Sequence, residues 1–580
     1  MPTKLSRYCL GIMESAWLAA VCIIPIYFNI YSSRIFEPDK ITILRSLALV
    51  SLAAWIVKLI EEGGIEWKKE SQDISFIKYL WQYPMIPPVI GLIIVYLLAT
   101  IFSVTPSISF FGSYQRLQGT YTTFSYLILF VSIVTNLRSR YQINRVVTTV
   151  ILTSLPVALY GVLQHYKIDP IPWGGNVSTR IASNMGNSIF VAAFLIMVFP
   201  LTIGRIIEVF REIINANDQE GLSSINTTKQ IIKATIYIFI AVLELIAIFW
   251  SQSRGPLLGL MTGVYFMVLL LSIYWRKRWL TITIIGFAIL GAAFLFVFNI
   301  RNGPLEALRS SPAIGRYGKL LDPESNSALV RQYIWEGTVK LVSVHEPVKF
   351  PDGSSDPFNF LRPIIGYGPE AMYVAYNQFY QPELGQVEKR NASPDRAHNE
   401  TWDSIVITGF VGLLVYLSIF SSVFYYGIKW LGLITTSQNK IFFLICLIGG
   451  GVIGAISLIV LKGIEFLGVG LPFGMIIGMV FYLTVYGLFS LSRPGEFQKD
   501  NPYSLLLIFL FAAIVGHFVE INFGIAIVAT RTLFWTYSGI LLVIGYILPK
   551  INVVETQKES EDESIETISI YPEKERFQMC

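Results

Sequence analysis

A histidine stands where a long polar segment of this sequence meets an apolar run. His398 is followed by Asn399 and, after nine further residues, by Gly409-Phe410-Val411-Gly412. Imidazole is the side chain whose ordinary pKa lies nearest neutrality, so His398 is a candidate general base. The alternative is an interfacial histidine whose ring lies among lipid headgroups.

Two arginines have a setting suited to anion recognition. Arg254 lies in Ser253-Arg254-Gly255-Pro256, which predicts a tight turn between two helices. Arg331 lies in a predicted helix over 327–342, with Trp335 four residues further on. The planar, always charged guanidinium matches phosphate oxygens in pairs. The alternatives are interface anchoring for Arg254 and a solvated helix face for Arg331.

A glycine pair lies between Arg331 and His398. Gly366-Tyr367-Gly368-Pro369 predicts a turn in which Gly366 and Gly368 let the backbone come close to a ligand.

Acidic side chains offer two further candidate sites. Glu37-Pro38-Asp39 would be the nearest ligands for a divalent metal, but a hard cation needs several converging oxygens, so we expect a solvated turn, no metal and no other cofactor. His517 and Glu520 share one helix face near the start of the helix that carries Arg531. A structural pair of Glu520 with Arg531 is the favoured interpretation, and a role of both residues in acceptor binding is the alternative.

The elements that hold these residues are membrane helices. Of the 580 residues, 53% are hydrophobic and only 14% are charged, which excludes a soluble protein. The net charge of +5 is small, so we infer no nucleic-acid partner from it. The four cysteines show no spacing for a disulfide framework or a zinc site.

Apolar windows long enough to cross a bilayer recur along the chain. They predict an all-α polytopic membrane protein of about fourteen spans, near 10–31, 41–60, 85–104, 120–137, 146–166, 188–210, 231–252, 255–275, 279–300, 401–427, 440–461, 464–491, 503–522 and 526–547.

The distribution of lysine and arginine predicts the orientation. Twenty of these residues fall in segments on one side, against seven on the other, so we expect the N-terminus in the cytoplasm. With an even number of spans, both termini are then cytoplasmic. This topology places Arg116, Arg180, Arg254, Arg331 and His398 together on the outer side.

The chain divides into four predicted parts. Residues 1–300 hold nine N-terminal spans, 301–399 form one large extracytoplasmic loop, 400–548 hold five C-terminal spans, and 549–580 form an acidic tail expected to be disordered. A connection as long as 301–399 is usually functional.

These motifs together resemble the O-antigen ligase and O-antigen polymerase superfamily. His398-Asn399 with its following Gly-x-x-Gly is similar to that superfamily's histidine signature. The elements Ser253-Arg254-Gly255, Arg331-x-x-x-Trp335, Gly366-x-Gly368 and Arg180 with Asn187 and Pro200 resemble its other motifs, in the same order, over roughly 110–425. The superfamily typically has about twelve spans, so fourteen implies extra helices.

The resemblance implies a membrane glycosyltransferase with a GT-C-like helical fold in the cytoplasmic membrane. Its donor is a glycan on undecaprenyl pyrophosphate, its acceptor is a hydroxyl of a lipid, glycan or protein, and transfer is inverting and metal-independent. His398 is then the base. Arg254, Arg331 and Arg180 bind pyrophosphate, and Asn399, Gly366, Gly368 and Arg116 support them.

Other functions remain open at this stage. Within the enzyme class, an O-antigen ligase, an O-antigen polymerase and a protein O-oligosaccharyltransferase share these motifs. Outside it, a flippase for lipid-linked glycans has a similar number of spans, although such transporters bind at mid-membrane through repeated halves, which this sequence lacks.

Overall fold

The computed structural model describes residues 3–64, 80–173, 175–217, 224–311, 314–320, 322, 324–388, 392–489 and 501–551. Over these residues the fold is helical, and the β pairing in them is one bridge between Lys349 and Ser355. Twelve helices in this part of the chain are long and apolar enough to span a bilayer. The predicted all-α polytopic membrane protein is therefore confirmed.

The N-terminal part consists of nine long helices and a short one. Their bounds are α1 Lys4–Ile26, α2 Glu37–Glu61, α5 Ile86–Ile101, α6 Pro106–Phe111, α7 Thr120–Asn136, α8 Arg140–His165, α9 Ser188–Asn217, α10 Ser224–Ser251, α11 Arg254–Tyr274 and α12 Arg278–Asn299. A 3₁₀ turn, η1, covers Ser183–Met185.

The long connection after α12 is built of short elements around one longer helix. These are α13 Glu306–Arg309, η2 Tyr317–Lys319, α14 Asn326–Val342, η3 Asn359–Leu361, α15 Arg362–Ile365, α16 Met372–Ala375, η4 Tyr376–Phe379 and α17 Leu384–Val387.

The C-terminal part again consists of long helices, two with π-helical segments. Their bounds are α18 Glu400–Trp430, α19 Ser437–Leu444 with η5 Ile445–Gly449 and α20 Gly450–Lys462, η6 Ile464–Phe466 with α21 Leu467–Phe489, α22 Ser504–Glu520 with η8 Ile521–Phe523, and α23 Val528–Leu542 with η9 Val543–Ile547.

Each predicted span corresponds to a helix, but two helices are short. Those two, α5 and α7, have 16 and 17 residues, so the number of fourteen spans stays a prediction. The predicted tail lies outside the described residues from 552 onward.

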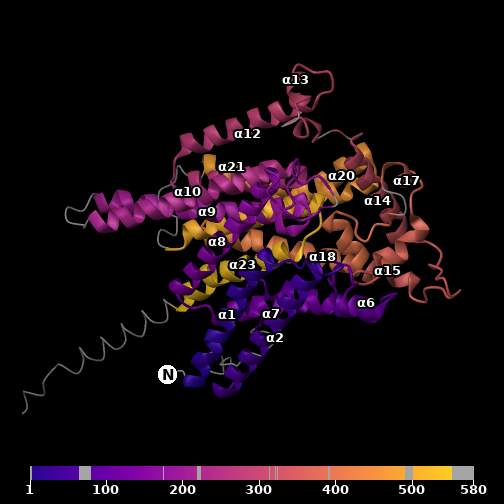
Figure 1. Ribbon diagram of the computed structural model, residues 1–580, viewed down its shortest axis with the longest axis horizontal. Coiled ribbons are helices and arrows are strands. Elements are labelled where there is room, and N and C mark those ends of the chain that lie inside the picture. Colours follow the sequence, from indigo (N-terminus) through magenta and orange to yellow (C-terminus); the bar gives the residue numbers. More distant parts are fainter. Residues whose placement is uncertain are drawn as a thin grey trace, which may run out of the picture.

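Burial divides the helices into a centre and a periphery. Of the residues in the most apolar part of α22, 89% are buried inside the protein. The corresponding share for α12 is 6%. In Figure 1, α12 accordingly lies apart from the other helices, at the top of the view. Helix α22 packs closely on α11 because Gly516 faces Gly259 and Gly263, and small residues let membrane helices approach.

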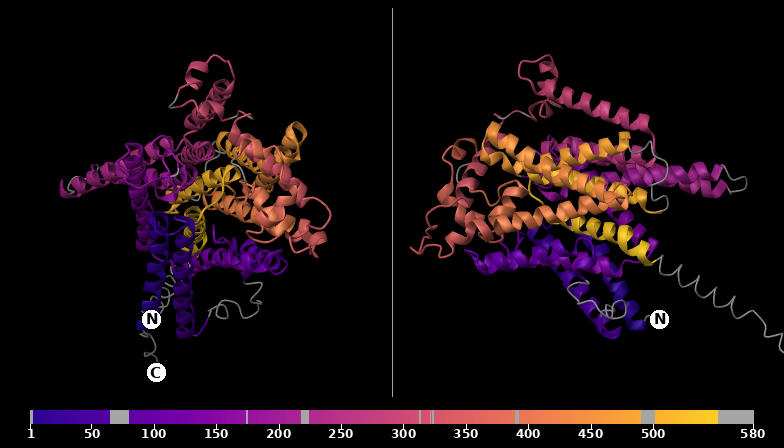
Figure 2. Two further views of the ribbon diagram at one scale, coloured as in Figure 1. Left: turned by 45° about the vertical axis from the view of Figure 1, so that its right-hand side comes forward. Right: turned by 180° about the vertical axis from the view of Figure 1, so that it is seen from behind.

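The elements of 301–399 gather at one end of the helices. In Figure 1, α14, α15 and α17 lie at the right-hand end, while the start of α1 lies toward the opposite end. The two views of Figure 2 show the same arrangement. The arginines and the histidine singled out above belong to the end that carries α14.

Candidate active site

His398 precedes the first turn of α18 and adopts a left-handed backbone conformation with a φ of 54°. Such conformations are uncommon for residues other than glycine and cluster at functional sites. The ring Nδ1 lies 3.1 Å from the carbonyl oxygen of Arg396. Because a carbonyl oxygen can only accept, Nδ1 carries the proton, and Nε2 of the neutral ring is left with the lone pair of a base.

The surroundings of His398 keep its ring neutral. Burial, and next the positive charge of Arg331, lower the pKa of His398 to about 4. At pH 7 the ring is therefore neutral and its Nε2 lone pair is unprotonated.

Asn399 fixes the position of His398 by capping α18. Its Oδ1 accepts from the backbone N–H of Trp402 at 3.0 Å. Its Nδ2 donates to the carbonyl oxygens of Gly468 at 2.7 Å and Asn522 at 2.9 Å. One fully buried side chain thus joins the starts of α18 and α21 to the end of α22.

A break in α18 holds its first two turns against the long connection. Gly409 has a φ of 69° inside the helix, a conformation that only glycine adopts without strain. At the break, the backbone N–H groups of Tyr367 and Gly368 donate to the carbonyl oxygens of Val406 at 2.8 Å and Ile407 at 3.0 Å. Gly366 and Gly368 therefore bring the backbone close to α18 itself.

Helix α14 connects the arginine motif to the histidine motif. Trp335 donates its indole N–H to the carbonyl oxygen of Ala397 at 2.9 Å, next to His398. One turn earlier, Arg331 donates to the carbonyl oxygen of Phe523 at 2.7 Å, and its Nε is buried without a hydrogen bond. The spacing of Arg331 and Trp335 thus places the guanidinium beside the histidine.

Arg254 and Arg331 line the same cavity of about 560 Å³. Arg254 starts α11 and donates to the carbonyl oxygen of Lys319 and to the hydroxyls of Ser325 and Ser327. Lys462 and Trp335 also line the cavity, as do the apolar side chains of Leu258 and Leu458. Asp322 lines it too, but this acid is paired with Arg301 and Arg309. The cavity is therefore mainly basic on one side and apolar on the other.

Two further arginines add positive charge at this place. Arg180 donates to the carbonyl oxygen of Ser251 at 3.3 Å. Burial lowers the pKa values of Arg331 and Arg180. The positive charges of Arg254 and Arg316 lower both pKa values further. Among the described residues, none of these four arginines forms an ion pair with an acid.

Arg116 differs from the four arginines above, which form no ion pair among the described residues. It forms a two-pronged ion pair with Asp395, three residues before His398. Its charge is therefore compensated, and it fixes the segment that leads to the histidine.

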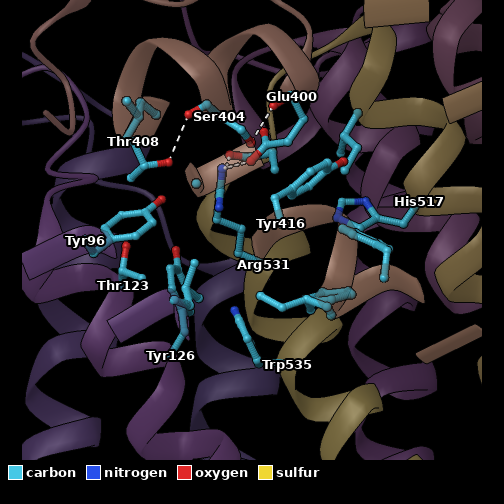
Figure 3. A pocket seen from close by; sticks show the side chains of 18 residues that line it. Tyr96, Thr123, Tyr126, Glu400, Ser404, Thr408, Tyr416, His517, Arg531 and Trp535 are labelled. Carbon is cyan, nitrogen blue, oxygen red and sulfur yellow. Dashed lines mark hydrogen bonds and ion pairs between the residues drawn. The ribbon is translucent and has the colours of Figure 1, made fainter. Parts of the chain in front are cut away.

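The expected pair of Glu520 with Arg531 is wrong. Arg531 donates to Glu400 at 2.7 Å, and Figure 3 shows its guanidinium pointing toward that carboxylate. Glu400 opens α18, so this pair joins α18 to α23. Glu520 is fully buried, lies 3.5 Å from His517, and neither of its oxygens has a hydrogen-bond partner among the described residues.

The expected solvated turn at Glu37 and Asp39 is wrong, because both acids lie in the first turn of α2 and Glu37 is buried. They do not line the cavity and have their own partners. Glu37 accepts from the backbone N–H of Val528 at 3.3 Å, and Asp39 accepts from Asn29 at 2.7 Å.

Sequence motifs do not identify Arg316 and Lys462 as site residues. Neither lies in a pattern that distinguishes it from other surface cations in the sequence. Only the fold brings Arg316 from the long connection, and Lys462 from the end of α20, to the arginines.

Comparison with known protein families gives a match within the chain. Residues 239–348 match the model of a family described as O-antigen ligase. The matched segment contains Arg254, Arg316 and Arg331 and ends before His398. No curated protein matches the chain.

Proposed function

We propose that this chain, whose residues 239–348 match a family described as O-antigen ligase, transfers a glycan from undecaprenyl pyrophosphate to an acceptor hydroxyl. The match supports membrane glycan processing of the ligase or polymerase type. The finer assignment is a ligase-type transferase in the cytoplasmic membrane, with its site on the outer side.

The observation that carries the proposal is the cavity lined by Arg254 and Arg331, neither in an ion pair within the described part of the chain, and by Trp335, which holds the residue before the neutral histidine. Cleavage of the donor's anomeric bond releases a pyrophosphate whose charge is costly at the edge of a membrane. Arg254 and Arg331 have N–H groups that can meet that charge, and among the described residues no carboxylate forms an ion pair with either. The apolar side of the cavity suits the first isoprene units of the lipid.

His398 acts as the base in the proposed reaction. Its Nε2 takes the proton of the acceptor hydroxyl while that oxygen forms a bond to the anomeric carbon. The bond from this carbon to the pyrophosphate oxygen breaks, and the electron pair leaves with the pyrophosphate. Attack from the face opposite to the leaving group inverts the configuration, and no covalent sugar intermediate forms.

Arginines perform the work that a metal ion does in other transferases, so we propose a metal-independent reaction. The test is transfer by purified protein in nanodiscs, with lipid-linked glycan from its native cells as the donor and membrane glycolipid as the acceptor. Product should form equally with and without EDTA. Loss of product that magnesium or manganese restores would instead support a metal site at Glu37 and Asp39.

A further inference from the structure

A second outer cavity, of about 590 Å³, lies between the turn that joins α1 to α2 and the segment that joins α8 to α9. Phe36, Trp173, Asn176, Val177, Arg180 and Asn187 are among the residues that line it. Arg180 belongs to the arginine group described above, so this cavity adjoins the proposed pyrophosphate site. The reaction as proposed leaves the rest of the cavity without a role.

Four aromatic rings form a continuous stack beneath this cavity. Trp173 lies on Phe36 with ring centres 5.6 Å apart and planes inclined by 17°. Phe36 lies on Phe28, and Phe28 on Tyr160, at 6.2 and 5.9 Å. Phe36 and Trp173 are partly exposed, so the stack offers aromatic surface to a ligand.

The stack is held rigidly from behind. The Asp169 carboxylate accepts from the indole N–H of Trp173 at 2.6 Å and from the hydroxyl of Tyr160 at 2.9 Å. Gly186 has no side chain where the ring of Phe36 lies, since a Cβ there would come within 2.6 Å of its Cγ. Asn184 donates to the carbonyl oxygens of Pro25 and Ile26, which fastens the two walls together.

The walls also carry unused hydrogen-bond donors. Asn176 and Asn187 use their Oδ1 atoms to accept from nearby backbone N–H groups. Their Nδ2 groups donate to no partner among the described residues. Both residues are exposed in the cavity wall.

We propose that this cavity binds a sugar ring of the donor's glycan, an inference that rests on the proposed function. The C–H face of a pyranose can pack on the electron-rich face of an aromatic ring, and its hydroxyls can accept from the free amides. A prenyl chain would leave those amides and Arg180 without partners. Arg180 lines this cavity and lies close enough to Arg254 for their charges to interact, so a donor with its pyrophosphate on Arg254 and Arg331 would have its glycan here.

Binding of the free glycan tests this subsite apart from the transfer reaction. The probe is the oligosaccharide released by mild acid from the undecaprenyl-linked pool of the native cells, and the readout is saturation-transfer NMR with protein in nanodiscs. Trp173→Ala removes the stacking surface, and Val177→Trp fills the cavity without altering the stack. We expect each to weaken binding by about tenfold or more, the size of one aromatic stacking contact.

Tyr31→Ala is the matched control, because Tyr31 is 94% exposed in the same outer turn and does not line the cavity. It should bind like the unmodified protein. Arg331→Ala should also retain binding of the free glycan even if it abolishes transfer, which separates failure of the subsite from failure of the proposed function. Unchanged affinity in both cavity variants, with folding verified by thermal unfolding, would overturn the proposal.

Binding of the donor's lipid, or of the acceptor, in this cavity would give different results from binding of the donor's glycan. Undecaprenyl pyrophosphate without a sugar should bind equally to the Trp173→Ala and unmodified proteins, and a loss there would assign the cavity to the lipid. In the transfer assay, Trp173→Ala should raise the KM for the donor. A rise in the KM for the acceptor alone would assign the cavity to the acceptor and would likewise overturn the proposal.

Discussion

Arg180, Arg254, Arg316 and Arg331 lie together without an acid partner among the described residues. Removing cations from water and placing them side by side costs several kcal/mol unless a counterion returns that energy. Burial, and next the repulsion by Arg254 and Arg316, lower the pKa of Arg331 to about 10, which still leaves it charged at pH 7. An anion bound among these arginines would return part of that energy.

Arg331→Lys tests whether the guanidinium fork is required. A lysine ammonium cannot reproduce two parallel hydrogen bonds, so we expect the affinity for the donor to fall by roughly ten- to hundredfold, nearly as much as in Arg331→Ala. The measurement is donor binding in nanodiscs. Arg34→Lys, at an exposed position between α1 and α2, is the control and should bind normally. Near-normal binding by Arg331→Lys would show that Arg331 contributes only its positive charge and not a pair of hydrogen bonds.

The pH dependence of transfer follows from the lowered pKa of His398. Because that pKa is about 4, the base is neutral above this value, and kcat/KM should be flat from pH 6 to 8 and fall only as the pH approaches about 4. This differs from a histidine with its ordinary pKa, which would begin to lose activity near pH 6.5. Arg331→Gln removes the positive charge that lowers the pKa of His398, so that pKa should rise. The residual activity of this variant should then begin to fall at a higher pH as the solution is made acidic.

An acidic limb near pH 6.5 in the unmodified protein would contradict the buried, neutral histidine.

Motifs identify residues such as His398, Arg254 and Arg331 because each lies in a short pattern of its own. Arg316 and the partner of Arg531 have no such signal. Spacing along one helix places His517 and Glu520 on the same face, but the acid that meets Arg531 comes from another helix. Such pairings depend on tertiary packing, which one sequence does not reveal.

At the scale of elements, the break in α18 is the feature on which the site most depends. Gly409→Ala forces a side chain into a left-handed backbone conformation and against the backbone of Ile365, at 2.5 Å from its nitrogen. We expect a loss of more than about 2 kcal/mol in stability and of transfer activity, measured by thermal unfolding and product formation.

Gly291→Ala in α12 is the matched control. No heavy atom lies within 4 Å of its added Cβ, so this substitution should be neutral or slightly stabilising. If the two variants unfolded at the same temperature, Gly409 would not be needed for its conformation.

Membrane helices are predictable because a bilayer requires about twenty apolar residues for each span. That requirement reveals the positions of all fourteen helices, including α5 and α7, whose short lengths leave the number of spans open. The break at Gly409 and the π-helical segments η5 and η9 are not predictable in this way, because they alter the backbone without changing hydropathy.

For the molecule as a whole, the proposed topology puts the cavity end outside the cytoplasm. Ser354 is exposed in the long connection, and Ser437 is exposed at the start of α19, at the other end of the helices. In a cysteine-free background, an impermeant thiol reagent should label Ser354→Cys in intact cells. It should label Ser437→Cys only after permeabilisation, and the reverse pattern would overturn the outer location of the site.

The central claim is that His398 performs the chemical step while the arginines hold the donor. His398→Ala should therefore bind lipid-linked donor with an affinity close to that of the unmodified protein and lower the single-turnover rate by about a hundredfold or more, the usual contribution of a general base. Both quantities are measured on the same nanodisc preparation. Normal turnover by His398→Ala would contradict the claim and leave this histidine a structural residue at the membrane boundary.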